Sequence, residues 1–248
     1  MLEIFRDVLD FSLLLGAIAT FVGGAVQGYS GFGGGPIIVP ILAILFYPLE
    51  AIAIVAISGL TGNLYLWPKA IPRTNWSEAV PVSIAIAISL PLALNFLVSA
   101  DPNLIRRGMG VFVLATAFIL MSGWTYPGRR NIFSSAVAGF FTGGVTGGFG
   151  IPGGPFMVVY FMSSKGDPPT QRANIVTCVV MLNLLLLGGL IVNGVYREAT
   201  LARAAVIVPV FVLGSALGQY LFKIAPLTWF KRVVYVILIV TGVSILIV

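Results

Sequence analysis

Histidine is absent from this 248-residue sequence, and cysteine occurs once, as Cys178. Without histidine the chain lacks the commonest general base and the commonest metal ligand. A single cysteine permits neither an internal disulfide nor a CxxC redox pair. We therefore expect no metal site, no cofactor and no catalytic residue, and an enzyme is the least favoured class of function.

Charge is also scarce, at 9% of the residues, whereas a soluble globular domain carries about 25%. Fourteen basic and eight acidic residues cannot cover the surface of a soluble protein of this size. Hydrophobic residues make up 58% of the chain, and the mean hydropathy is +1.05. Because about 20 apolar residues make one membrane span, the composition predicts an all-α polytopic membrane protein. The lipid bilayer is therefore an expected partner.

The net charge of +6 could indicate binding to nucleic acid. In a membrane protein it is better interpreted as an excess of lysine and arginine in cytoplasmic loops. No basic run exceeds two residues, as in Arg106-Arg107 and Arg129-Arg130. We therefore expect no nucleic-acid partner.

Ten apolar segments, separated by charged or Gly/Pro-rich stretches, follow one another along the chain. The first five are Leu9–Gln27, Pro36–Tyr47, Ala51–Trp67, Ala79–Ser99 and Gly108–Trp124. The second five are Ile132–Val145, Pro155–Met162, Ala173–Val192, Leu201–Phe222 and Val233–Val248. No connection is long enough to hold another domain, so residues 1–248 are predicted to form one membrane domain.

The two series of five resemble each other. Phe-Val-Gly-Gly at 21–24 is matched by Phe-Thr-Gly-Gly at 141–144, and Asn63-Leu64 by Asn183-Leu184. Such matches recur in order at a spacing of about 120 residues, which indicates an internal duplication. Repeat 1 covers about residues 8–125, and repeat 2 about 131–248. An odd number of segments reverses direction across the bilayer, so the sequence predicts two inverted repeats.

The basic residues suggest an orientation. If the loops alternate between the two sides, one side holds nine basic residues: Lys69, Arg73, Arg129, Arg130, Lys165, Arg172, Lys223, Lys231 and Arg232. The other side holds five, namely Arg6, Arg106, Arg107, Arg197 and Arg203. The richer side should be cytoplasmic. This places both termini outside a cell inner (plasma) membrane.

Two glycine clusters, at residues 23–35 and 143–154, each precede an unusually short segment that begins with proline. We interpret each cluster as a break between two helices, either broken or re-entrant, near the membrane midplane. Non-helical backbone at that depth must be buried in protein or line a cavity. Glycine N–H groups and the N-terminus of the following helix could there bind an anion. Close helix packing through small residues is the alternative explanation for such clusters.

Candidate substrate-binding residues come from these breaks and from two asparagines that occupy equivalent positions in the repeats. Gly31, Gly33, Gly148 and Gly150 are expected to hold positive φ or to lie against the ligand. The full set is Gln27, Ser30, Gly31, Phe32, Gly33, Gly34, Asn63, Thr146, Gly148, Phe149, Gly150, Gly153 and Asn183. Interhelical hydrogen bonding is the competing explanation for each polar member. Arg172, Arg106 and Arg107 are interpreted as interfacial anchors.

The sequence resembles the TauE/SafE family of sulfite exporters and sulfonate permeases. The resemblance rests on Gly-Phe-Gly-Gly-Gly-Pro at 31–36, on Gly-Phe-Gly-Ile-Pro-Gly-Gly-Pro at 148–155, and on the duplication. It extends over essentially the whole chain. It implies a multi-pass transporter of sulfur-containing anions such as sulfite and organosulfonates. A negative membrane potential drives anions outward, so we expect an exporter of sulfite, thiosulfate or an organosulfonate.

Two alternatives stay open at this point: an anion channel of the same fold, and a permease for a carboxylate anion without sulfur. The sequence also leaves the oligomeric state open, and a homodimer is one possibility.

Overall fold

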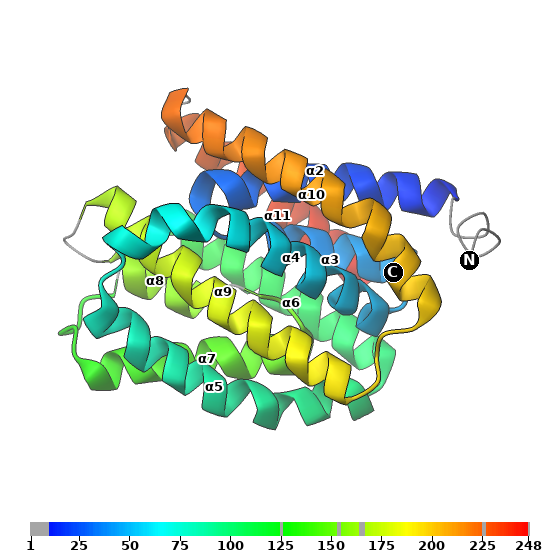
Figure 1. Ribbon diagram of the computed structural model, residues 1–248, viewed down its shortest axis with the longest axis horizontal. Helices are drawn as coiled ribbons and strands as arrows, with labels where there is room; N and C mark the ends of the chain where they lie inside the picture. Colours follow the sequence, from blue (N-terminus) through cyan, green and yellow to red (C-terminus); the bar gives the residue numbers. More distant parts are fainter. Residues whose placement is uncertain (1–9, 125, 153–154, 164–166, 225–226, 248) are drawn as a thin grey trace.

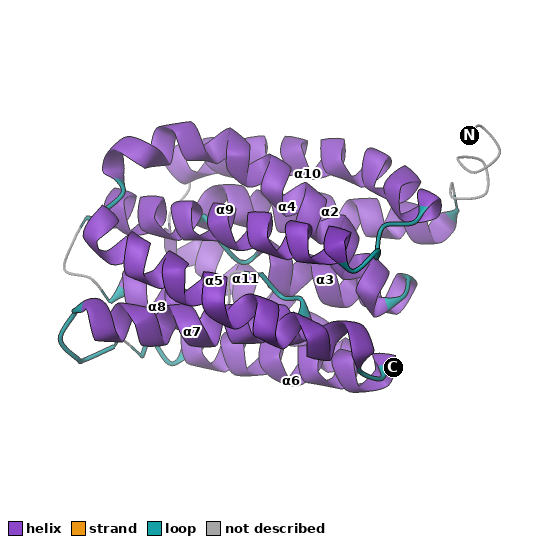
Figure 2. Ribbon diagram, turned by 60° about the horizontal axis from the view of Figure 1, so that its bottom comes forward, coloured by secondary structure: helices purple, strands orange, loops and turns teal. Residues whose placement is uncertain are grey.

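A computed structural model describes residues 10–124, 126–152, 155–163, 167–224 and 227–247. The described chain is helical and contains no strand (Figure 2). Its elements are α2 (Phe11–Ser30), α3 (Gly34–Leu45), α4 (Pro48–Ala70), the 3₁₀ turn η1 (Ile71–Arg73), α5 (Trp76–Ser99), α6 (Pro102–Met121), α7 (Ile132–Phe149), α8 (Pro155–Met162), α9 (Pro168–Val192), α10 (Glu198–Ile224) and α11 (Leu227–Ile247). Each of the ten predicted segments corresponds to one α-helix, which confirms the all-α prediction.

Seven of these helices, η1 counted with α4, are long and apolar enough to cross a membrane. Large apolar side chains cover the outer surface: Phe118 is 75% exposed and Phe133 is 77% exposed. Such a surface is unsuited to water and suited to lipid. The protein is therefore a multi-pass membrane protein, as its composition predicts.

The two short helices do not cross. α3 has 12 residues and α8 has 8, so they are roughly 18 Å and 12 Å long, against a hydrocarbon core of about 30 Å. Gly16 lies near Leu42, and Gly23 near Ile38, so α3 runs back along α2. In the same way the Ser135 and Tyr160 hydroxyls are 2.7 Å apart across α7 and α8. Each short helix thus forms a hairpin with the helix before it.

The helices pair across the two series. The first helix of each series packs against the fourth helix of the other, which gives the pairs α2–α10 and α5–α7 (Figure 1). The third helices, α4 and α9, pack on each other, and so do the fifth helices, α6 and α11. A duplicated chain is expected to give equivalent contacts of this kind. The inversion of the two repeats stays a prediction.

Glycine allows the first of these pairs to approach closely. A Cβ added to Gly28 would overlap the backbone of Ser215 on α10, and one added to Gly218 would overlap the carbonyl of Ala25 on α2. On the other side of the molecule Gly139, Gly143 and Gly147 lie in the same way against α5. The packing explanation is therefore correct for Gly28 in α2 and for Gly139, Gly143 and Gly147 in α7. The glycines between the helices have a different role.

Candidate functional site: the junction of two glycine-rich breaks

The first break lies between α2 and α3. Gly31 caps the C-terminus of α2 with φ of 84°, and Gly33 precedes α3 with φ of 90°. Both values lie in the left-handed region, where a Cβ is disfavoured. Gly34 opens α3, whose first N–H groups have no partner within the helix.

The second break follows α7. Gly150 caps that helix with φ of 67°. Gly148 is still inside α7 and is not among the described glycines with positive φ, so of its two expected roles only contact with a ligand stays a prediction. The helix extends one residue past Gly148, to Phe149, because only at Gly150 does the chain turn away. Gly153 lies outside the described residues.

Gln27 connects the first break to a neighbouring helix. Its Nε2 donates to the carbonyl oxygen of Gly31 at 3.3 Å, and its Oε1 accepts a hydrogen bond from the Gly34 N–H at 3.1 Å. The same Nε2 lies 3.0 Å from Oδ1 of Asn63 on α4. One buried side chain therefore bridges both ends of the break and fixes them to α4.

Thr146 has the corresponding position at the second break. Its Oγ1 donates to the carbonyl oxygen of Ile151 at 3.0 Å, across the turn that follows α7. The threonine side chain is shorter than that of glutamine, and its hydrogen bond stays within the turn that follows α7. Among the described residues of the second break, Thr146 therefore does not reach across as Gln27 does.

The two breaks meet. A Cβ added to Gly35 of the first break would lie 2.7 Å from Cγ of Pro152 in the second. Beside this contact is a cavity of about 10 Å³, here called the junction cavity. Its lining brings three predicted residues together with six others: Gln27, Gly35, Val55, Gly59, Asn63, Pro152, Val179, Asn183 and Phe211.

The equivalent asparagines differ in one respect. Asn63 Nδ2 donates to the Gly59 carbonyl at 2.7 Å, and Asn183 Nδ2 donates to the Val179 carbonyl at 3.0 Å. Asn63 Oδ1 then accepts the bond from Gln27, whereas Asn183 Oδ1 is buried without a partner within the described chain. An unsatisfied buried acceptor costs about 1–3 kcal/mol. The junction cavity thus contains one hydrogen-bond acceptor that has no donor among the described residues.

Other predicted residues lie away from the junction cavity. Ser30 and Phe32 line a larger cavity at the end of α2. The Phe149 ring packs edge-on against Phe96, 6.1 Å between centroids, and Gly148 faces the same ring of Phe96. These last two residues serve helix packing in this structure.

Sequence reasoning missed several lining residues. Gly35 and Pro152 belong to the glycine clusters, so their position in the breaks was a usable signal. Gly59 was not singled out, although a Cβ there would lie 3.2 Å from Asn183 Oδ1. Phe211 carries no sequence signal for a site, because it is one of many apolar residues of α10.

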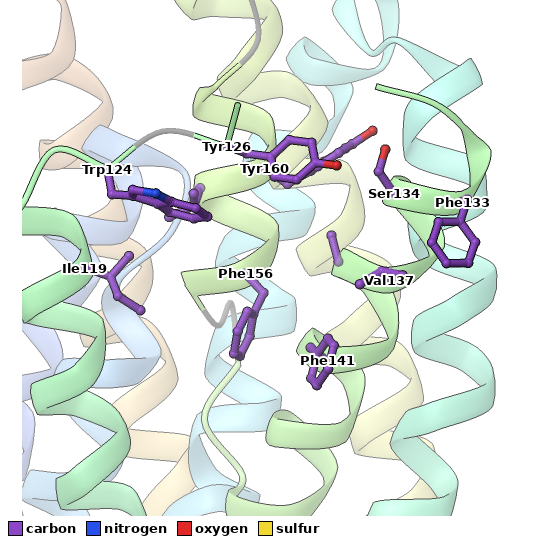
Figure 3. A pocket seen from close by; sticks show the side chains of 11 residues that line it. Ile119, Trp124, Tyr126, Phe133, Ser134, Val137, Phe141, Phe156 and Tyr160 are labelled. Atoms are coloured by element: carbon purple, nitrogen blue, oxygen red, sulfur yellow. The ribbon is translucent and has the colours of Figure 1, made fainter. Parts of the chain in front are cut away.

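A separate aromatic cavity of about 270 Å³ lies between α6, α7 and α8. Figure 3 shows Trp124, Phe141 and Phe156 around it, with Tyr126 and Tyr160 at one end. No charged residue lines it among the described residues. Such a lining is suited to an apolar group and unsuited to an anion. We therefore do not place the solute site there.

Comparison with known proteins agrees with the resemblance noted in the sequence. The family described as "Sulfite exporter TauE/SafE" matches residues 15–245. A protein of Cupriavidus necator, named "Probable sulfite/organosulfonate exporter TauE", is 25% identical over 254 residues, covering 98% of this chain and 95% of its own. No solved structure matches. Since the family match spans nearly the whole helical bundle that forms the junction, this chain belongs to the TauE/SafE family and is a membrane transporter, not an enzyme.

Proposed function

We propose that this protein exports sulfite, thiosulfate or a small organosulfonate, and that the anion passes through the junction of the two glycine-rich breaks. The Cupriavidus necator relative is named for export of sulfite and organosulfonates, and we extend that solute class to this chain. The bilayer around it is a cell inner membrane, with both termini outside, as the distribution of basic residues suggests.

The observation that carries the proposal is the junction cavity itself. It is lined by side chains and backbone from both repeats, and its volume of about 10 Å³ holds one water molecule at most. A sulfur oxyanion is larger, so this conformation is closed. Passage then requires the two hairpins to separate, as in alternating access between two repeats.

The chemistry of the lining suits an oxyanion. Gln27, Asn63 and Asn183 are neutral amides that can present N–H donors after a rotation. Gly34 and Gly35 lie in the first turn of α3, at the positive end of the helix dipole. No acidic residue lines the junction cavity among the described residues. Neutral donors bind an anion without the strong desolvation penalty of a buried cation.

The direction of transport follows from the membrane potential. An anion leaving a cell with a negative interior gains about 2.3 kcal/mol per charge per 100 mV. Uptake would need a coupled ion. The six described acids all lie at an N-cap or in the first turn of a helix: Asp10, Glu50, Glu78, Asp101, Asp167 and Glu198. None is placed in mid-span to carry a proton, which favours uncoupled export.

The experiment compares two asparagines of α9. Asn183 lines the junction cavity, whereas Asn193 is exposed at the end of the helix, and both amides bond the carbonyl four residues earlier. In proteoliposomes, Asn183→Ala should reduce sulfite efflux about tenfold or more, the loss of one hydrogen bond to a charged group. Asn193→Ala should transport at the parent rate.

The folded yield of Asn183→Ala should stay close to that of the parent. The variant removes an acceptor that has no partner among the described residues, and the Nδ2 bond that it also removes goes to Val179, a carbonyl inside α9 that the helix backbone can bond as well. Parent-like efflux by this variant would contradict the proposal. Efflux that does not saturate with sulfite concentration would instead indicate a channel. Equal competition by acetate would indicate a carboxylate permease.

A further inference from the structure

A cavity of about 320 Å³ lies at the end of the molecule where α6, α8 and α10 end and α9 begins. We name it the vestibule. Ser30 and Phe32 from the first break line it, together with Arg172 and Gln171 of α9 and apolar side chains of the neighbouring helices. By the distribution of basic residues, this end is predicted to be cytoplasmic. Unlike the junction cavity, the vestibule has room for a small oxyanion.

Arg172 is the one cationic side chain among the described residues that line the vestibule. Its Nε donates to the Tyr29 carbonyl at 3.1 Å, and its Nη2 to the Gly28 carbonyl at 2.6 Å. The guanidinium also lies over the ring of Phe222, 4.9 Å from its centroid. Two of its five N–H groups are thus engaged, and the other three have no partner in the described chain.

The bonds to Tyr29 and Gly28 place a cation at the C-terminus of α2, where it interacts favourably with the helix dipole. Helix capping alone would explain them. Capping does not explain why the vestibule places this cation among apolar side chains without an acidic partner in the described chain. No acid lines it among the described residues, and Asp167, the acid nearest in sequence, is exposed. Apolar walls of Leu120, Ile175 and Phe222 weaken the screening of the charge.

A comparison of equivalent positions in the two repeats shows a cation beside the first break and none at the equivalent position of the second. Gly31 and Gly150 cap the first helix of each repeat. A Cβ on Gly31 would meet the side chain of Arg172 at 3.2 Å, whereas one on Gly150 would overlap the side chain of Ile52. Arg172 follows Ile52 by the repeat spacing of about 120 residues. At equivalent positions one break therefore has an arginine and the other an isoleucine.

Gly31 lies between Ser30 and Phe32, which line the vestibule, and it is bonded by Gln27, which lines the junction cavity. On one side it faces the Arg172 side chain, and its carbonyl oxygen accepts the bond from Gln27. We propose that the vestibule is a binding site for a sulfonate or sulfite anion, which pairs there with Arg172 before the junction opens. The class of anion rests on the proposed function. The site itself rests on the cavity, the guanidinium and the contrast with Ile52.

The first test measures binding by the purified full chain through its thermal stabilisation by methanesulfonate. A ligand that binds only the folded state stabilises it in proportion to RT ln(1 + [L]/Kd). Arg172→Gln should need about ten- to a hundredfold more methanesulfonate than the parent for the same rise in melting temperature, because it loses a charged hydrogen-bond donor. Arg172→Lys keeps the charge and should need less than tenfold more. Arg73→Gln removes an exposed cation at the same end and should behave as the parent.

A second test does not depend on changing Arg172. In a Cys178→Ser background, Ser30→Cys should react with N-ethylmaleimide, and methanesulfonate should slow this reaction. Ser122→Cys, which is exposed at the same end and does not line the vestibule, should react at a rate that methanesulfonate does not change. Methanesulfonate is used because sulfite itself adds to maleimides.

The outcomes separate the two proposals. If the parent binds methanesulfonate but Arg172→Gln binds it equally well, or if Ser30→Cys is not protected, the vestibule site is wrong and the proposed function stands. If neither methanesulfonate nor sulfite stabilises the parent protein, and the parent transports neither anion, the vestibule site and the proposed function are both wrong. Equal stabilisation by dimethyl sulfone, which is neutral and of similar size, would overturn recognition by charge.

Discussion

Gly33 has a backbone φ of 90°, and a Cβ there would meet only Cγ1 of Val26, at 3.1 Å. Gly144, in the other cluster, would place a Cβ in open space inside α7. Both are glycines of the same kind of cluster in the sequence. Their surroundings make them a matched pair, because only one of them needs the absence of a side chain.

We predict that Gly33→Ala impairs transport more than folding. A left-handed alanine costs roughly 1 kcal/mol, which is small beside a typical folding free energy, but it shifts the backbone between Gln27 and α3. Sulfite efflux should fall about tenfold at near-normal folded yield, and Gly144→Ala should match the parent in both. Quantifying folded protein and efflux from the same preparation tests this. A Gly33→Ala protein with parent-like efflux would remove the first break from the transport path.

Gly150 differs from Gly33, although the sequence suggests the same effect for both. Its φ is 67°, and a Cβ there would also overlap the side chain of Ile52. Alanine at this position therefore combines backbone strain with a steric clash. Loss of Gly150→Ala from the membrane would reflect folding, so Gly33 is the more informative position.

At the scale of the helices, α2 has two roles. One face packs against α10 through glycine, and its end forms the first break. The α2–α3 hairpin positions Gln27 because the chain turns back at Gly31 and Gly33 and places α3 beside α2. The packing face holds the hairpin in the bundle, and the break presents the polar groups.

We predict that Gly28→Ala lowers folded yield and transport together. Its Cβ would overlap the backbone of Ser215, and backbone cannot move aside as a flexible side chain can. Overpacking of this kind costs about 1–3 kcal/mol or more. Gly188→Ala on α9 is the control, since nothing lies within 4 Å of its added Cβ. Thermal denaturation should show a lower melting temperature for the first and no decrease for the second. Normal stability of Gly28→Ala would contradict the close α2–α10 contact.

At the scale of the whole molecule, the sidedness of the membrane decides which cavity faces the cytoplasm. The Cys178→Ser background suits this question, because Cys178 is buried and is the single cysteine of the sequence. Arg129 and Asn103 are exposed near opposite ends of α6. Asn103 is preferable to Asp101, whose carboxylate caps α6.

We predict that Asn103→Cys is labelled by an impermeant thiol reagent added to intact cells, and that Arg129→Cys is labelled only after the cells are opened. The reason is the excess of lysine and arginine on the side of Arg129. Labelling of both from outside would contradict the predicted topology. The reverse pattern would move the vestibule to the outer face.

Much of the fold was predictable from the sequence because each helix corresponds to a continuous run of apolar residues. The ends of the helices were predictable only in part. α9 begins at Pro168 and α10 at Glu198, before the apolar segments that start at Ala173 and Leu201. First turns accept polar residues and proline, so a reading based on apolarity begins the helix too late.

The class of the protein, the order of its helices and the two breaks were predictable from the sequence, because hydrophobicity and glycine or proline conformation act locally along the chain. The membership of the site depends instead on contacts between distant segments. The Gln27–Asn63 bond joins residues 36 apart, and the Arg172–Gly28 bond joins residues 144 apart. The same packing placed Gly148 and Phe149 against α5, and it left Asn183 Oδ1 without a partner among the described residues. Such contacts depend on how whole helices pack, and no local pattern specifies them.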